Sequence, residues 1–213
     1  MTTHIYAFGS VCRGEITPDS DVDLLAITLG SDDRFNPETY SIYSHSRLKE
    51  IWGEGSPFAW HLSLESKLVF SSNGFDFLRD LGRPAAYRTA IPNCRKFYDL
   101  FVSSANALVS GTNSPVFEMS TIFLAIRNFA TCYSLGNGIP DFSRYSALRI
   151  GADSLTISHE IFRTLERARL LCTRGTGNML TRNEAKPVTL ALNEIEKWMQ
   201  KLLTAMVSNE QLQ

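Results

Sequence analysis

A short polar window between two apolar runs most constrains this chain. The first run ends at Gly9-Ser10, and Asp21 and Asp23 then lead into the second run, residues 24–27. Side chains alternate in direction along a strand, so two carboxylates one residue apart point to the same face. The window therefore predicts a Gly-Ser turn and a carboxylate pair at neighbouring strand ends.

The residue types in this window suit metal and phosphate binding. Carboxylates are hard oxygen ligands for divalent cations, and two on one face repel each other unless a cation intervenes. Gly9 lets the backbone approach a ligand closely, and Ser10 adds a hydroxyl where a phosphate can rest. Asp is also common in ordinary turns, but the complete pattern favours transfer chemistry on a nucleoside triphosphate.

The pattern resembles the polymerase-β-type nucleotidyltransferase superfamily, in which Gly-Ser precedes a spacer of similar length and then Asp-x-Asp. It is closest to the small prokaryotic branch of minimal and kanamycin-type enzymes, which often has Arg-Gly after the Gly-Ser and Ser before the first Asp. The matching residues are Gly9, Ser10, Arg13, Gly14, Ser20, Asp21, Asp23 and Leu24.

The resemblance implies a set of cofactors and site residues. Mg²⁺ or Mn²⁺ would be held by Asp21 and Asp23, with ATP or another nucleoside triphosphate as substrate. The nucleotide-binding residues would be Gly9, Ser10, Arg13 and Ser20. For Arg13 the residues leave a second possibility open, an ion pair with Asp19 or Glu15.

A third acidic residue from a later strand completes the superfamily site, and here two candidates compete. Residues 58–71 are expected to form a third strand region, because Trp60, Leu62 and Leu64 alternate with His61, Ser63 and Glu65. Aligning the apolar positions places His61 where the acid is expected, and Glu65 would lie about 13 Å further along an extended strand. Either Glu65 is the carboxylate in a different register, or His61 replaces it as general base. Alternatively, both residues form only the polar side of an edge strand.

Composition narrows the possible partners and compartment. The 21 basic and 22 acidic residues give a net charge of −1, so the chain as a whole lacks the positive charge that is typical of proteins that bind long nucleic acids. The four scattered cysteines include no C-x-x-C pair, which argues against a structural zinc site. The start of the chain lacks the regions of a signal peptide, and no apolar run could span a bilayer. We therefore expect a cytoplasmic protein without membrane partners.

Periodicity predicts an α+β chain with two domains. Residues 1–90 should form the nucleotidyltransferase domain, a mixed β-sheet with flanking helices, whose first two strands are residues 4–8 and 22–28. Residues 91–213 should form an all-helical bundle that is HEPN-like or substrate-binding, with the nucleotide between the two domains. Its expected helices are residues 93–109, 116–135, 157–173 and 184–207.

The helical half carries polar residues that need partners but no ribonuclease motif. HEPN ribonucleases have Arg followed four to six residues later by His, whereas Arg127 is followed by Cys132 and Tyr133, so ribonuclease activity is rejected. Arg127 is expected to hold an acid such as Asp141. The other histidines, His4, His45 and His159, have no ligand spacing and receive no role.

Three functions follow as hypotheses. The first is metal-dependent transfer of a nucleoside monophosphate, with AMP from ATP expected, to a hydroxyl on a small molecule, a protein or an RNA end. The second is a catalytically degenerate module that binds nucleotide or a partner. The third is an antitoxin-type enzyme that modifies a HEPN toxin. The apolar segment 116–135 could also form the seam of a homodimer.

Overall fold

The computed structural model describes residues 2–15, 22–30 and 32–210 of the chain. Two residues that the sequence assigns to the site, Ser20 and Asp21, lie outside these ranges. The chain divides into two compact units, Met1–Arg88 and Thr89–Gln213. Each unit is described by itself.

In the part of the N-terminal unit that the structure describes, four strands form a mixed sheet in the order β3-β2-β1-β4. The central strand β1 (His4–Phe8) runs antiparallel to both β2 (Asp23–Thr28) and β4 (Ser66–Ser71). Strand β3 (Tyr40–Ser44) runs parallel to β2. The predicted mixed sheet is therefore confirmed, and the expected strands 4–8 and 22–28 correspond to β1 and β2.

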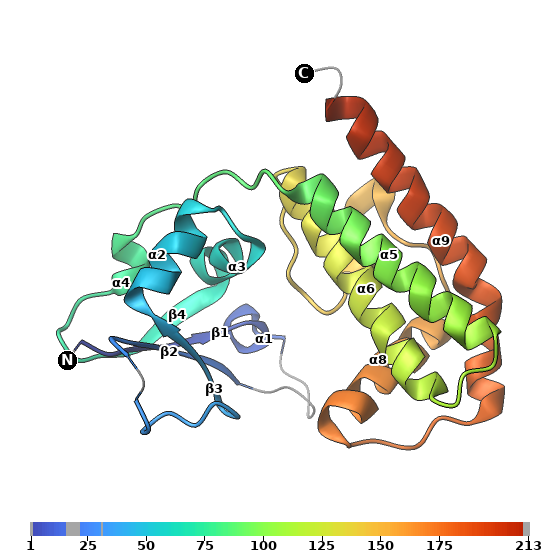
Figure 1. Ribbon diagram of the computed structural model, residues 1–213, viewed down its shortest axis with the longest axis horizontal. Helices are drawn as coiled ribbons and strands as arrows, with labels where there is room; N and C mark the ends of the chain where they lie inside the picture. Colours follow the sequence, from blue (N-terminus) through green and yellow to red (C-terminus); the bar gives the residue numbers. More distant parts are fainter. Residues whose placement is uncertain (1, 16–21, 31, 211–213) are drawn as a thin grey trace. The chain divides into compact units, whose positions relative to one another are not determined.

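Among the described residues of this unit, four helices accompany the sheet, and α2 and α3 cover one of its faces (Figure 1). Two of the helices are single turns, α1 and α4, and only Gly9 lies between β1 and α1. The bounds are Ser10–Arg13 for α1, His45–Gly53 for α2, Pro57–Glu65 for α3 and Phe77–Asp80 for α4.

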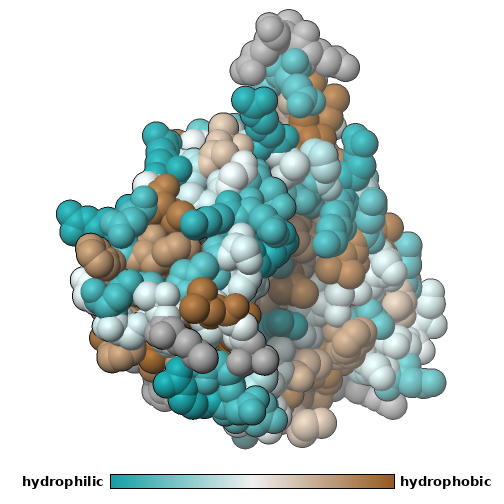
Figure 2. Space-filling model, turned by 60° about the vertical axis from the view of Figure 1, so that its left-hand side comes forward, coloured by the Kyte–Doolittle hydropathy of each residue, from teal (hydrophilic) through white to brown (hydrophobic). Residues whose placement is uncertain are grey.

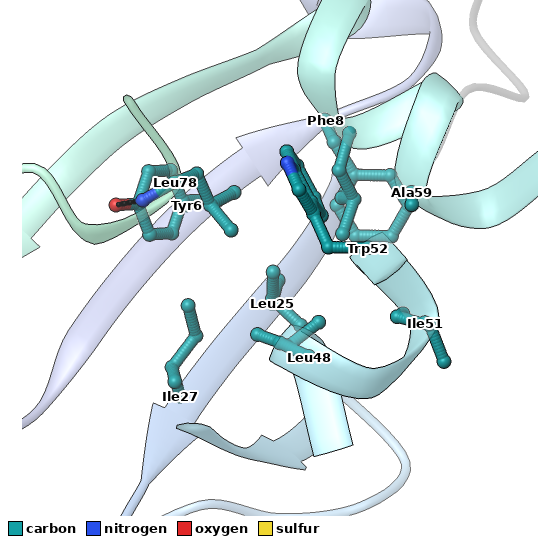
Figure 3. Packing of buried hydrophobic residues seen from close by; sticks show 10 residues of the cluster. Tyr6, Phe8, Leu25, Ile27, Leu48, Ile51, Trp52, Ala59 and Leu78 are labelled. Carbon is teal, nitrogen blue, oxygen red and sulfur yellow. Dashed lines mark hydrogen bonds between the residues drawn. The ribbon is translucent and has the colours of Figure 1, made fainter. Parts of the chain in front are cut away.

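The core of this unit forms between the sheet and the covering helices. Tyr6 and Phe8 from β1 and Leu25 and Ile27 from β2 point toward the helices (Figure 3). The helical side of the core consists of Leu48, Ile51, Trp52, Ala59, Leu62 and Leu78. Asp23 lies two residues before Leu25 on β2. Because residues two apart on a strand lie on the same face, the side chain of Asp23 lies on the face of the sheet that the helices cover.

The expectation of a strand beginning at residue 58 is wrong, because Pro57–Glu65 is helix α3. The side chain of Ser56 caps this helix by accepting a hydrogen bond from the Ala59 amide at 3.2 Å, and Pro57 occupies its first turn. Both residues favour helix initiation, because Ser satisfies a free amide and Pro has no amide to satisfy. The strand β4 begins only at Ser66, and its apolar residues Leu68 to Phe70 are exposed.

The C-terminal unit is helical, as the periodicity predicts. Helix α6 packs against both α5 and α8 (Figure 1) and has buried residues around most of its circumference, including Met119, Ile122, Ile126 and Phe129. The helices are α5 (Ala90–Val109), α6 (Pro115–Gly136), α7 (Ser146–Arg149), α8 (His159–Arg174) and α9 (Arg182–Glu210), with a 3₁₀ turn at Gly151–Asp153. Together the two units give the α+β class.

Apolar as well as polar side chains reach the surface. On the face drawn in Figure 2, apolar patches are interrupted by polar side chains. Within the described ranges, no helix has the length and apolar character needed to cross a bilayer.

Candidate active site

The carboxylate of Asp23 lies against the backbone of Gly9. Gly9 follows β1 with φ of +77°, a conformation that side-chain-bearing residues rarely adopt. A Cβ atom added at Gly9 would lie only 2.5 Å from Oδ2 of Asp23. The absence of a side chain at residue 9 is therefore what leaves room for this carboxylate.

The remaining residues of the motif are only partly described. Ser10 is the first residue of α1, directly after the Gly9 turn, and it is half-buried. The second carboxylate, Asp21, is outside the described ranges. Among the residues that the structure places, no group of three or more His, Cys, Asp or Glu side chains could hold a metal ion. The two-carboxylate metal site thus stays a prediction.

The helix places His61 and Glu65 side by side instead of about 13 Å apart as on an extended strand. The two residues are one turn apart on α3, and Nε2 of His61 lies 3.0 Å from Oε2 of Glu65. Each side chain is 15% exposed. From the sequence, these residues are alternatives for one position, whereas in the structure their side chains are neighbours.

Arg13 joins this pair from the end of α1. Its Nε donates to Oε2 of Glu15 at 3.0 Å, and its Nη1 forms an ion pair with Oε2 of Glu65. Burial disfavours the guanidinium charge, but the hydrogen bonds and charges of Glu15 and Glu65 outweigh burial and raise the pKa of Arg13. The ion pair with Glu15 is one of the alternatives that the sequence leaves open for Arg13, and the contact with Glu65 adds a partner that the sequence did not indicate.

Phe8 connects the two groups of site residues. Its backbone register partner on β2 is Asp23, so the two side chains share one face of the sheet. The ring of His61 meets the ring of Phe8 edge-on at 5.6 Å between centroids. The Gly9–Asp23 contact and the His61–Glu65–Arg13 cluster therefore lie at the same end and on the same face of the sheet.

A second polar cluster, which sequence spacing did not reveal, lies at the other end of β1. Nε2 of His45 is 3.3 Å from Nδ1 of the buried His4, and Nδ1 of His45 is 3.1 Å from the carbonyl oxygen of Thr28. Burial, with a smaller contribution from His45, lowers the pKa of His4. These two histidines are 41 residues apart in sequence, so only the β1–β2 pairing and the β3–α2 connection reveal their proximity.

In the C-terminal unit, Arg127 holds a backbone segment. Its Nη2 donates to the carbonyl oxygen of Phe142 at 3.3 Å, and its own carbonyl accepts from the hydroxyl of Ser146 at 3.0 Å. The carboxylate of Asp141, the expected partner, accepts from the amide of Ser143 at 2.7 Å. These contacts support a structural role for Arg127 in fixing residues 141–146 against α6.

The N-terminal part of the chain matches a known protein family. Residues 2–81 match the nucleotidyltransferase domain family. This match covers most of the N-terminal unit and confirms that this part of the chain resembles the polymerase-β-type nucleotidyltransferase superfamily. Comparison with curated proteins found no match.

Proposed function

We propose that the protein transfers a nucleoside monophosphate from a nucleoside triphosphate to a hydroxyl group, with ATP as the expected donor. The observation that carries this proposal is the packing of the Asp23 carboxylate against the side-chain-free Gly9 turn. The match of residues 2–81 to the nucleotidyltransferase domain supports the general reaction, since such domains transfer nucleotidyl groups. The choice of ATP and of the acceptor belongs to the proposal.

The described part of the site fits a divalent cation in its donor chemistry. Asp23 presents a carboxylate at the strand end, and the Gly9 turn leaves that carboxylate the space that a Cβ would fill. Together with Asp21, it would hold Mg²⁺ or Mn²⁺ through hard oxygen ligands. A cation bound there would supply charge stabilisation for the phosphoryl oxygens.

The residues of the chain itself bind and orient the substrate. Gly9 allows the triphosphate to approach the backbone, and the hydroxyl of Ser10 donates to a phosphate oxygen. Ser20 is assigned to the same task from the sequence. Because such catalysis relies mainly on positioning and electrostatics, attack of the acceptor hydroxyl in line with the leaving pyrophosphate depends on how rigidly these groups are held.

Nucleotide binding without turnover is the second candidate function. The observation in its favour is that Glu65, the candidate third carboxylate, is already engaged by Arg13 and His61. If those contacts fully occupy the carboxylate, the domain would bind nucleotide but lack the group that activates the acceptor hydroxyl.

The test uses the full-length protein with Mg²⁺ and each of the four α-labelled ribonucleoside triphosphates, in the presence of a cell extract as acceptor source. Asp23→Asn, which keeps the size of the side chain but removes its charge, is the matched variant. Label transferred to an acceptor by the wild type and reduced at least about 100-fold in the variant supports the proposal.

Metal-dependent nucleotide binding without transfer, measured by calorimetry, would favour the binding module instead. Equal transfer by wild type and Asp23→Asn would contradict the assignment of the site.

A further inference from the structure

A pocket of about 390 Å³ opens at the β4 edge of the sheet, on the face that the helices cover. Tyr6 and Ser66 line it from the strands β1 and β4, and Arg79 and Arg83 line it from α4 and the loop that follows α4. A volume of this size holds a small molecule, whereas the surface of a protein partner needs a much larger area.

The loop that carries Arg83 is held in place by two tryptophans. Nε1 of Trp52 donates to the carbonyl oxygen of Gly82 at 2.9 Å, and Nε1 of Trp60 donates to that of Ala85 at 3.0 Å. The guanidinium of Arg83 lies over the ring of Trp60, 5.0 Å from its centroid. An anion that binds Arg83 therefore meets a side chain that is already ordered, and less conformational entropy is lost on binding.

The charged residues of this pocket leave it positive. Arg79 and Arg83 contribute two cations, and neither guanidinium forms an ion pair within the part of the chain that the structure describes. Asp76 contributes the single negative charge of the lining. Its Oδ1 accepts from the amide of Arg79 at 3.2 Å and from the hydroxyl of Tyr6 at 2.7 Å. The same hydroxyl accepts from the amide of Leu78 at 3.0 Å (Figure 3), so the protein itself holds the carboxylate.

A larger pocket of the same unit has the opposite charge. It measures about 790 Å³, and its charged lining residues are Asp32, Asp33 and Arg34. Nη2 of Arg34 is paired with Oδ2 of Asp32 at 2.6 Å, so this arginine already has a carboxylate partner. Positive charge is thus a specific property of the pocket at the β4 edge. Arg34 provides a matched control for its two arginines.

The pocket borders the row of residues that contains Asp23. Ser66 pairs with Phe8, and Phe8 pairs with Asp23 on its other side, so the three side chains share one face of the sheet. Neighbouring strands lie about 4.8 Å apart, which places the backbone of Ser66 about 10 Å from that of Asp23. A small molecule in the pocket can therefore extend past Ser66 toward the carboxylate.

From this arrangement we infer that the pocket binds the acceptor, a small hydroxyl compound that carries a phosphate group, with Arg79 and Arg83 on the phosphate. This inference rests on the proposed function, which it narrows to one kind of acceptor. Two guanidinium groups suit the charge of about −1.5 to −2 on a phosphate monoester, and the hydroxyl of Ser66 adds a neutral donor.

The reaction that follows is balanced by the leaving pyrophosphate. The hydroxyl oxygen of the bound acceptor forms a bond to the α-phosphorus of the nucleoside triphosphate, and the bond from that phosphorus to the pyrophosphate oxygen breaks. The pyrophosphate leaves with the electron pair, and the proton of the hydroxyl passes to solvent. The phosphate of the acceptor takes no part in the bond changes and serves only to position the hydroxyl.

The first experiment measures binding without turnover. Inorganic phosphate is titrated into the full-length protein at constant ionic strength, and the amide NMR signals of Ser66 and Gly82 are followed. Arg79→Gln and Arg83→Gln should each weaken binding at least about tenfold, because each removes a charge-assisted hydrogen bond. Arg34→Gln should leave binding unchanged. Both pocket arginines are exposed, so their substitution should not disturb folding.

The second experiment measures transfer from an α-labelled nucleoside triphosphate. The cell extract that serves as acceptor source is used either untreated or after treatment with a phosphatase that is removed before the nucleotide is added. Transfer by the wild type should fall at least about tenfold with the treated extract, and each pocket variant should show a similar loss with the untreated extract. The KM for the nucleotide should stay within about twofold, because the pocket does not hold the triphosphate.

The outcomes separate this inference from the proposed function. Wild-type transfer by both variants, or full transfer to the phosphatase-treated extract, would overturn the inference while the proposed function stands. A raised KM for the nucleotide in the variants would also overturn it, because the arginines would then bind the triphosphate. If the wild type transfers nothing to either extract, the proposed function fails and the acceptor role fails with it. Binding of inorganic phosphate that does not depend on Arg79 or Arg83 would overturn the phosphate site itself.

Discussion

The two sides of the candidate site differ in how they are built. The Gly9–Asp23 side comes from two adjacent antiparallel strands and the short segment between them. The other side joins α1 to the α3–β4 junction through Arg13, His61 and Glu65, which span 52 residues of sequence. The first side can be recognised from a local motif, whereas the second depends on the correct secondary structure of residues 57–65.

The largest expected effect distinguishes a helix from a strand in residues 57–65. On a strand Leu62 and Leu64 would share one face, but on α3 Leu62 is fully buried and Leu64 is 53% exposed. Leu62→Ala should lower the free energy of unfolding of the N-terminal unit by about 2–5 kcal/mol. Leu64→Ala should change it by less than about 0.5 kcal/mol. Hydrogen exchange of the β1 amides measures the free energy of unfolding of both variants. Equal losses of stability in the two variants would indicate that residues 57–65 form a strand.

The next prediction tests the Gly9–Asp23 side. Gly9→Ala should reduce nucleotidyl transfer at least about tenfold, because the new Cβ must displace the Asp23 carboxylate. Gly14→Ala is the matched control. Gly14 also has a positive φ, of +74°, but a Cβ there would meet no atom within 4 Å. Equal losses in the two variants would attribute the effect to backbone strain alone, so the initial rates of both variants must be compared.

A smaller effect is expected from the cap that starts α3. Ser56→Ala removes the acceptor for the Ala59 amide and should cost about 1 kcal/mol of stability. Ser63→Ala, at an exposed position within the same helix, should be nearly neutral. Chemical denaturation of both variants checks this, and a neutral Ser56→Ala would show that tertiary packing alone specifies the helix.

The smallest expected effect concerns the His4–His45 cluster at the far end of β1. Because the folded-state pKa of His4 is lowered from 6.5, the unfolded state binds more protons below that pH. The neutral His4 therefore contributes stability above its unfolded pKa, and folding is disfavoured as the pH falls below 6.5. In thermal unfolding between about pH 5 and pH 8, His4→Gln should show a weaker loss toward acid than the wild type. His159→Gln in the C-terminal unit serves as control, and identical acid slopes for wild type and His4→Gln would refute the assignment.

The sequence predicts much of the fold because most elements carry a clear period or cap. The strands at 4–8 and 22–28 and the long helices of the C-terminal unit match their patterns closely. Strand β3 has no clear sequence signal, because its sequence, Tyr-Ser-Ile-Tyr-Ser, is short and mixed in polarity. The alternation of apolar and polar residues predicts a strand over residues 58–71, but the first part of this segment is helix α3, for which Ser56-Pro57 is the local signal.

The contacts of the candidate site also differ in whether the sequence could predict them. The contact between Gly9 and Asp23 follows from the motif, because both residues lie at the paired ends of adjacent strands. The contact between His61 and Glu65 could have been found from the four-residue spacing once a helix was recognised. The contact of Arg13 with Glu65 has no sequence signal, because it depends on how α1 packs beside the start of β4.

The junction between α3 and β4 has no connecting residue, since the helix ends at Glu65 and the strand begins at Ser66. Length variation is consequently intolerable at this point. One inserted residue would either turn Glu65 by about 100° around the helix axis or move every side chain of β4 to the opposite face. Insertions in the polar segment between β2 and β3 would leave both intact. In any engineered or natural variant, the distance from residue 57 to residue 71 should therefore be fixed, while the segment after residue 29 is free to lengthen.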